Sequence, residues 1–187
     1  NSSAPCIGKV SIGSGNHIVS TEKLESGRYY LYVYAIDSNI DTKNDFDTHT
    51  ENVIKVDKTK PEIVFDKITY DGKWAYDHEI TISVSDAHSG VSSASYCFKV
   101  SNKDGTYNSS APCIGNMKAV ANPVKTDQLG SEIYYLYVYA EDSNVDYKNK
   151  FYKHTENVIK VDKTKPTIEF TKITYNGLWA YDHEITI

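Results

Sequence analysis

The chain has 187 residues, 20 of them basic and 25 acidic, and its formal net charge is −5. This mildly negative balance argues against a phosphate-binding surface, and hence against nucleic acid as a partner. Only Arg28 among the basic residues is an arginine, so bidentate recognition of anions is not expected to be the main task. No apolar run approaches the roughly 20 residues needed to span a bilayer.

The sequence repeats itself at the spacing of a small domain. The copied segments are residues 1–8 (NSSAPCIG) with 108–115, 29–35 (YYLYVYA) with 134–140, and 50–82 with 155–187. The later copies lie 105 residues apart, which matches one β-sandwich module and exceeds the period of a solenoid repeat. We therefore expect an all-β chain of tandem modules, each of about 105 residues.

The copies predict where modules begin and end. We expect residues 1–57 to be the C-terminal part of a truncated module, 58–162 a complete module, and 163–187 the N-terminal part of a third. The junction at residues 56–61 (VDKTKP) ends one strand, and Pro61 prevents ladder pairing where the next begins. So short a linker predicts a stiff array whose neighbouring repeats are partners.

The first strong strand signal is the tyrosine-rich segment 29–35. Its small and aliphatic residues alternate with tyrosines and are expected to face the core. The tyrosines then form an outer ladder of Tyr30, Tyr32 and Tyr34, repeated as Tyr135, Tyr137 and Tyr139. Rigid amphipathic side chains of this kind are favoured at contacts, which makes the ladder a candidate interaction face. The alternative is a cross-strand aromatic surface without a partner.

The turn after this strand carries oxygen-bearing side chains at alternate positions. They are Asp37, Asn39 and Asp41 in the first copy, and Asp142, Asn144 and Asp146 in the second. This spacing is compatible with calcium, although the glycine and glutamate of an EF-hand are missing. Asp and Asn also build turns by bonding their own backbone, so a plain Asx-rich turn is the alternative and no cofactor is required.

The first strand of each module reveals its faces through its two copies. The copies differ at every second residue, at positions 62, 64 and 66 and their counterparts, and agree in between. The varying side is expected to face solvent, and Ile63, Phe65 and Lys67 are expected to face inward.

No segment carries an enzymatic motif. A glycine-rich phosphate loop, G-x-S-x-G and H-E-x-x-H are all missing from the sequence. Asp77, His78 and Glu79 are consecutive strand residues, so they point to opposite faces and do not converge on one substrate atom. We expect a protein that is not an enzyme.

The three cysteines follow the repeat. Cys97 and Cys113 lie in the complete module, and Cys6 is the counterpart of Cys113. A Cys97–Cys113 disulfide is expected, with Cys6 unpaired, and it indicates an oxidising, extracellular setting. Free thiols and a metal site are the alternatives, the latter weak because two thiols sixteen positions apart lack a second pair.

Taken together, these motifs resemble a known kind of surface module. Each repeat reads VDKTKPxI, a Gly-x-Trp, EITISVSDAHSGV and YYLYVYAxDSN. This order resembles the immunoglobulin-like modules of bacterial, especially Gram-positive, cell-surface proteins. The resemblance implies an immunoglobulin-like β-sandwich at a cell surface. It also implies a candidate isopeptide crosslink from Lys67 to Asn157, assisted by Glu79.

Two functions are compatible with such repeats. The first is a structural extracellular stalk or filament, because near-identical modules suit a spacer, with lateral self-association as a further contact. The second is an adhesin module that binds a host protein or glycan through the tyrosine face. A spacer fragment would show no saturable binding, whereas an adhesin fragment would.

Overall fold

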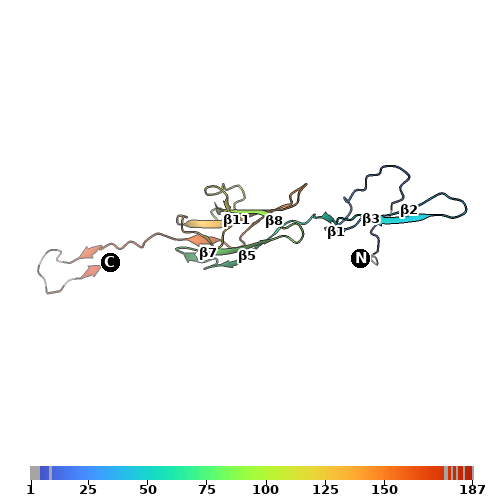
Figure 1. The fold of residues 1–187 in the computed structure, drawn as a ribbon. Coiled ribbons are helices and arrows are strands. Elements are labelled where there is room, and N and C mark those ends of the chain that lie inside the picture. Colours follow the sequence, from blue (N-terminus) through green and yellow to red (C-terminus); the bar gives the residue numbers. More distant parts are fainter. Residues whose placement is uncertain are drawn as a thin grey trace. The chain divides into compact units, whose positions relative to one another are not determined.

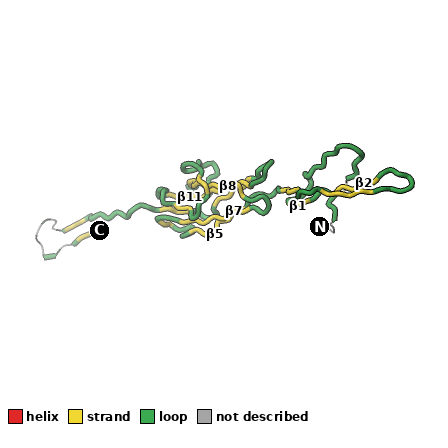
Figure 2. The backbone as a smooth tube through the Cα atoms, viewed as in Figure 1, coloured by secondary structure: helices red, strands yellow, loops and turns green. Residues whose placement is uncertain are grey.

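The computed structural model describes residues 5–8, 10–174, 177, 179, 181–182 and 184–186, in two compact units, Asn1–Thr59 and Lys60–Ile187. Throughout this described part the chain forms strands and loops without a helix, as Figure 2 shows. The prediction of an all-β chain is thereby confirmed. Accordingly, none of the described segments is a helix with the length and apolar character that a membrane crossing requires.

The first unit contains two antiparallel strand pairs. β1 (Gly27–Tyr29) pairs with β4 (Ile54–Val56), and β2 (Tyr32–Ile36) pairs with β3 (Asp45–His49). Aromatic and β-branched residues favour the extended backbone of β2. Its side chains nevertheless remain exposed along the whole strand, so the expectation that Val33 and Ala35 face a core is wrong for this copy.

The second unit contains the remaining described strands. They are β5 (Glu62–Ile68), β6 (Trp74–Ala75), β7 (Glu79–Ser85), β8 (Val91–Val100), β9 (Lys118–Ala119), β10 (Val124–Lys125), β11 (Glu132–Asp142), β12 (Lys150–His154), β13 (Ile159–Val161), β14 (Lys172–Ile173) and β15 (Ile185–Thr186). β14 and β15 pair only with each other among these described strands.

Two sheets of the second unit share one core. One sheet has the order β10-β7-β5, and the other has the order β6-β13-β11-β8-β9, with β12 also paired to β11. Figure 1 draws β5 and β7 in one layer and β8 and β11 in the layer facing it. The shared core consists of Ile63, Ile80, Ile82, Phe98, Val124, Tyr134, Leu136, Val138, Ala140, Ile159 and Val161. Burial of these side chains from both sheets gives the unit a sandwich-like build.

The faces of β5 agree with the prediction at its start and differ at its end. Ile63 is buried and Phe65 is partly buried, whereas Glu62, Val64 and Asp66 are exposed. The inward placement of Lys67 is wrong, because Lys67 is exposed. The pairing register with β7 shifts between Phe65 and Lys67, and such a bulge turns the following side chain out of the alternation.

The chain begins and ends this sandwich at opposite ends. Glu62 pairs with Ser85 at one end of the β5–β7 ladder, and Ile68 pairs with Ile80 at the other. The backbone oxygen of Lys160, near the end of β13, lies 3.0 Å from His78 Nε2 beside that second end. The polypeptide therefore enters where β5 begins and leaves where β5 ends.

Candidate functional site: the tyrosine face and the junction anchor

The tyrosine face of the second unit is the outer side of β11. Leu136, Val138 and Ala140 are fully buried on the core side. Tyr135, Tyr137 and Tyr139 therefore lie on the opposite side, since side chains alternate along a strand. The predicted assignment of core and outer sides is confirmed for this strand.

The tyrosine face is not uniformly exposed, which corrects one prediction. Tyr135 is only 7% exposed, and its hydroxyl donates a 3.0 Å hydrogen bond to the backbone oxygen of Gly105. The Tyr107 ring lies 5.4 Å from the Tyr135 ring and stacks on His154 at 3.8 Å. The loop of residues 101–117 thus folds back over this part of the sheet and covers Tyr135.

Further along the face the aromatic rings stack on one another. Tyr152 on β12 lies 6.0 Å from Tyr137 and 5.1 Å from Tyr139, with interplanar angles of 26° and 37°. Lys99 places its ammonium 4.8 Å from the centre of the Tyr137 ring, which is a cation–π contact. The ring faces are thereby turned toward neighbouring side chains rather than offered as a flat platform.

The matching tyrosines of the first unit are open. Tyr30 is 53% exposed, Tyr32 50% and Tyr34 54%. Among the described strands β2 pairs with β3 alone, whereas its counterpart β11 pairs with β8, β12 and β13. The difference in exposure at Tyr135 follows from the 101–117 loop, which covers that part of the face in the second unit.

Burial and a neighbouring carboxylate make the Tyr139 hydroxyl harder to ionise. Burial, followed by the hydrogen bond to Glu141, raises the pKa of Tyr139 to about 12. The same hydrogen bond lowers the pKa of the Glu141 carboxyl, with help from Lys150 and Lys148 at 3.6 Å. Burial also raises the pKa of Tyr137. The face therefore keeps neutral tyrosines well above neutral pH.

The predicted disulfide between Cys97 and Cys113 is present. The two Cα atoms lie 5.5 Å apart. Cys97 is buried opposite Tyr137, so the bond ties the 101–117 loop to the tyrosine face. Cys6 is an exposed, unpaired cysteine within the described residues.

The acidic turns bond to themselves. Asp142 Oδ1 accepts hydrogen bonds from the backbone nitrogens of Asn144 at 3.1 Å and Asn149 at 3.0 Å. Asp142 Oδ2 accepts a third from the Asn149 side chain at 2.6 Å. The side chain of Asp146 lies exposed. These bonds form the Asx turn that sequence considerations offered as the alternative to calcium.

The turn of the first copy has the same pattern. Asp37 accepts hydrogen bonds from the backbone of Asn39 and from both the backbone and side chain of Asn44. Asn39 in turn accepts one from the backbone of Asp41. Calcium at either turn stays a prediction.

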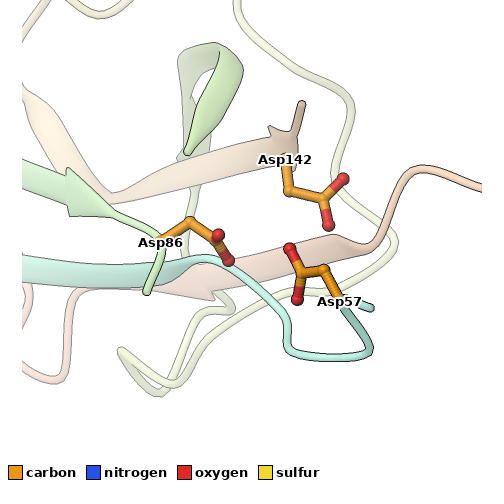
Figure 3. A group of neighbouring side chains, drawn as sticks. All are labelled: Asp57, Asp86 and Asp142. Atoms are coloured by element: carbon orange, nitrogen blue, oxygen red, sulfur yellow. The ribbon is translucent and has the colours of Figure 1, made fainter. Parts of the chain in front are cut away.

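A pair of carboxylates lies where β5 begins. Asp86 follows β7 and Asp142 ends β11, and their carboxylate oxygens lie within 4.8 Å of each other. Figure 3 shows both side chains at their strand ends, and it also labels Asp57, which belongs to the Asn1–Thr59 unit. Such oxygens are the ligands that calcium prefers, but Asp142 already accepts bonds from its own turn.

The residues of the candidate isopeptide lie apart. Lys67 borders a shallow depression together with Glu79, and Glu79 forms a 2.9 Å ion pair with Lys125. Asn157 borders a different depression and donates a 2.9 Å hydrogen bond to Asp71. All three members of the predicted crosslink are exposed, and the structure does not bring Lys67 and Asn157 together.

A junction anchor ties the end of the second unit's sandwich to the segment that leaves it. We use this name for Lys163 and the groups it contacts. The Lys163 ammonium donates to the backbone oxygens of Thr126 at 3.2 Å and Asp127 at 2.5 Å, and lies 5.3 Å from the Tyr76 ring centre. Its backbone nitrogen donates to Ser131 Oγ at 2.7 Å.

The first unit repeats the junction anchor. The Lys58 ammonium donates to the backbone oxygen of Glu22, and the Lys58 backbone nitrogen donates to Ser26 Oγ at 2.8 Å. Asp57 Oδ1 accepts bonds from both the nitrogen and the hydroxyl of Thr59, at 3.0 and 2.7 Å. Asp162 holds Thr164 in the same way. The same sequence therefore builds the same local structure twice.

Sequence reasoning missed the residues that cover the tyrosine face. Tyr107, Lys99, Tyr152 and His154 all contact the tyrosines there. The signal available was the predicted disulfide, because a bond from Cys97 on the outer face must draw the following loop onto that face.

Comparison of the chain with protein-family models, with curated proteins and with solved structures finds no match.

Proposed function

We propose that the chain is a structural repeat of an extracellular, cell-surface stalk or filament, built from tandem immunoglobulin-like modules. The observation that carries this proposal is the path of the chain through the second unit. The polypeptide enters at one end of the sandwich and leaves at the other, where Lys163 anchors it. Modules joined in this way extend end to end instead of folding back on one another.

The strand order supports the immunoglobulin-like part of the proposal. Three strands, β5, β7 and β10, face a sheet in which β13, β11 and β8 are neighbours. The chain crosses between the sheets after β5, and the short β6 pairs parallel with β13. This connectivity supports an immunoglobulin-like sandwich as the proposed topology, although the disulfide lies within one sheet and its loop instead of joining the two sheets.

The repeated junction anchor supports the proposal that the linker between modules is stiff. The lysine ammonium is bonded to one backbone oxygen of the preceding module in the first copy and to two in the second, and in both copies an aspartate accepts hydrogen bonds from the threonine two residues later. Each such contact removes conformational freedom from the linker, so neighbouring repeats are the natural partners. The Cys97–Cys113 disulfide supports an extracellular setting, since such bonds persist in oxidising compartments.

An adhesin that captures a host protein or glycan is the second candidate. The exposed Tyr30, Tyr32 and Tyr34 favour it, and these side chains would equally serve lateral self-association. The covered Tyr135 and the mutually stacked rings of the second unit weigh against a repeated sugar platform. A binding surface is expected to recur in the complete module, and there the face is largely occupied.

Solution scattering on one, two and three tandem copies of residues 58–162 tests the stalk. The longest dimension should increase by roughly 36 Å per added copy, the length of an eleven-residue strand such as β11. Binding to glycan and host-protein arrays is measured on the same samples. Linear growth without saturable binding supports the stalk, whereas compact three-copy particles or saturable binding would contradict it.

A further inference from the structure

His78 is a buried histidine that neither the tyrosine face nor the junction anchor uses. It is 0% exposed and lies at the end of the sandwich where the chain leaves. Its Nδ1 lies 2.6 Å from the backbone oxygen of Thr69, after β5, and its Nε2 lies 3.0 Å from the backbone oxygen of Lys160 in β13. One imidazole ring therefore connects the two sheets.

Both partners of this ring are acceptors. A neutral imidazole has one N–H and one lone pair, so only one of the two contacts would be a hydrogen bond. The other would set a nitrogen lone pair against a carbonyl oxygen, in a buried place where an unmet polar contact is costly. An imidazolium has two N–H groups and satisfies both carbonyls at once.

We propose that His78 is doubly protonated in the folded protein and acts as a proton-dependent clip between the two sheets. The backbone around it is fixed independently of the ring. His78 N donates to Thr126 Oγ1 at 2.8 Å and to Asp77 Oδ1 at 2.9 Å, which holds the imidazole between Thr69 and Lys160.

The charged surroundings are compatible with a cation. The neighbouring Asp77 carboxylate also accepts bonds from the nitrogen and hydroxyl of Thr126, at 3.0 and 2.6 Å, so it stays close to His78. The titratable and charged residues on the elements packed around His78 are Lys67, Tyr70, Asp71, Lys73, Tyr76, Asp77, Glu79, Lys125, Asp127, Lys160, Asp162 and Lys163. Glu79 is paired with Lys125, and the Lys163 ammonium is bonded to backbone oxygens.

The clip makes stability depend on pH with a definite sign. In acid, both the folded and the unfolded chain carry the second proton, so the two-carbonyl contact is fully present. As pH rises, the unfolded histidine loses its proton first, and holding the proton in the folded state becomes costly. The free energy of unfolding should therefore fall as the pH rises above the ordinary pKa of a histidine in the unfolded chain, about 6.5.

Ring nitrogen NMR on the whole chain tests the protonation directly. For His78 at about pH 7, both nitrogens should resonate in the range of protonated ring nitrogens. Widely separated nitrogen shifts, as a single neutral tautomer gives, would overturn the proposal. This measurement needs no variant and so does not depend on the folding of one.

Two neutral replacements test the consequence. Each of His78→Asn and His78→Gln keeps a side-chain amide donor near one of the two carbonyls and removes the titration. Both should lose the His78-dependent fall of the urea midpoint with rising pH. His154→Gln is the matched control, since its Nδ1 faces one carbonyl, that of Thr155, at 2.8 Å, and the pH-dependent fall should persist. A wild-type slope in both His78 variants would overturn the clip.

Discussion

Tyr135 and Tyr30 occupy the same position in two copies of one seven-residue sequence, yet Tyr135 is 7% exposed and Tyr30 is 53% exposed. The local pattern sets which side of the strand a tyrosine takes. Whether that side meets water depends on residues elsewhere, here Tyr107 and the loop oxygen of Gly105. How much a residue contributes to the free energy of unfolding therefore depends on the residues that cover it.

Replacing Tyr135 with serine should destabilise the second unit. The change removes a buried ring and its hydrogen bond to Gly105, which should lower the free energy of unfolding by about 3 kcal/mol. Tyr30→Ser is the matched control and should cost less than about 0.5 kcal/mol. Urea unfolding followed by circular dichroism measures both. Equal small effects would show that the loop does not cover Tyr135 in solution.

Tyr139 should make the protein sensitive to alkali. Burial and the bond to Glu141 raise its pKa to about 12, compared with about 10 for a tyrosine in the unfolded chain. Below pH ~10 both states keep the proton, and the stability is fully present. Between pH ~10 and ~12 the unfolded chain ionises first, so the free energy of unfolding falls as pH rises.

Urea midpoints measured from about pH 9 to 11.5 check this alkaline loss. Tyr139→Phe has no proton to lose at this position and should show a shallower decline than the wild type. Tyr147→Phe, at an exposed loop residue, serves as the control and should decline like the wild type. If Tyr139→Phe declines as steeply as the wild type, the Tyr139 pKa is not raised.

At the scale of strands and loops, the alternation of residue types was sufficient to predict which side of several strands faces the core. Alternation identified Leu136, Val138 and Ala140 as core, and the copy comparison identified the exposed side of β5 at its start. The alternation predicted the wrong side for Lys67, because the bulge arises from the pairing with β7 and cannot be recognised from the sequence of β5 alone. The covering of Tyr135 was equally non-local, since the 101–117 loop closes through the Cys97–Cys113 bond.

The candidate site was less predictable than the strands for a similar reason. The tyrosines and cysteines were recognisable as residue types, but Lys99, Tyr152 and His154 gain their roles only through pairing of β8 and β12 with β11. The two nitrogen contacts of His78 likewise join residues separated by nine and 82 positions. The prediction that Asp77 and His78 are strand residues is wrong, because both precede β7, which begins at Glu79, and sequence reasoning did not reveal the partners of His78.

Lys163 should stiffen the segment that leaves the sandwich. Lys163→Met keeps much of the side-chain length but removes the donors to Thr126 and Asp127, and this should cost about 1 kcal/mol. The rate of proteolysis within residues 161–166 should rise, since the segment opens more often. Lys165→Met, in the same segment but exposed, is the control. Equal cleavage rates in the two variants would argue against an anchoring role.

At the scale of the whole molecule, the residues of the buried core all come from one continuous stretch of the sequence. Its first member is Ile63 and its last is Val161. The described strands beyond it, β14 and β15, pair only with each other and contribute none of the buried core residues. The energy that orders the sandwich therefore comes from residues within 58–162.

An isolated 58–162 fragment should consequently unfold in one cooperative transition. Its melting midpoint should agree within about 3 °C with the corresponding transition of the whole chain, because no core side chain is removed. A fragment of residues 86–187 is the control: it lacks β5 and β7, and with them Ile63, Ile80 and Ile82, so it should show no cooperative transition. Differential scanning calorimetry measures both. If 58–162 melted without cooperativity, the core would need residues outside these limits, and a stalk of autonomous modules would no longer be supported.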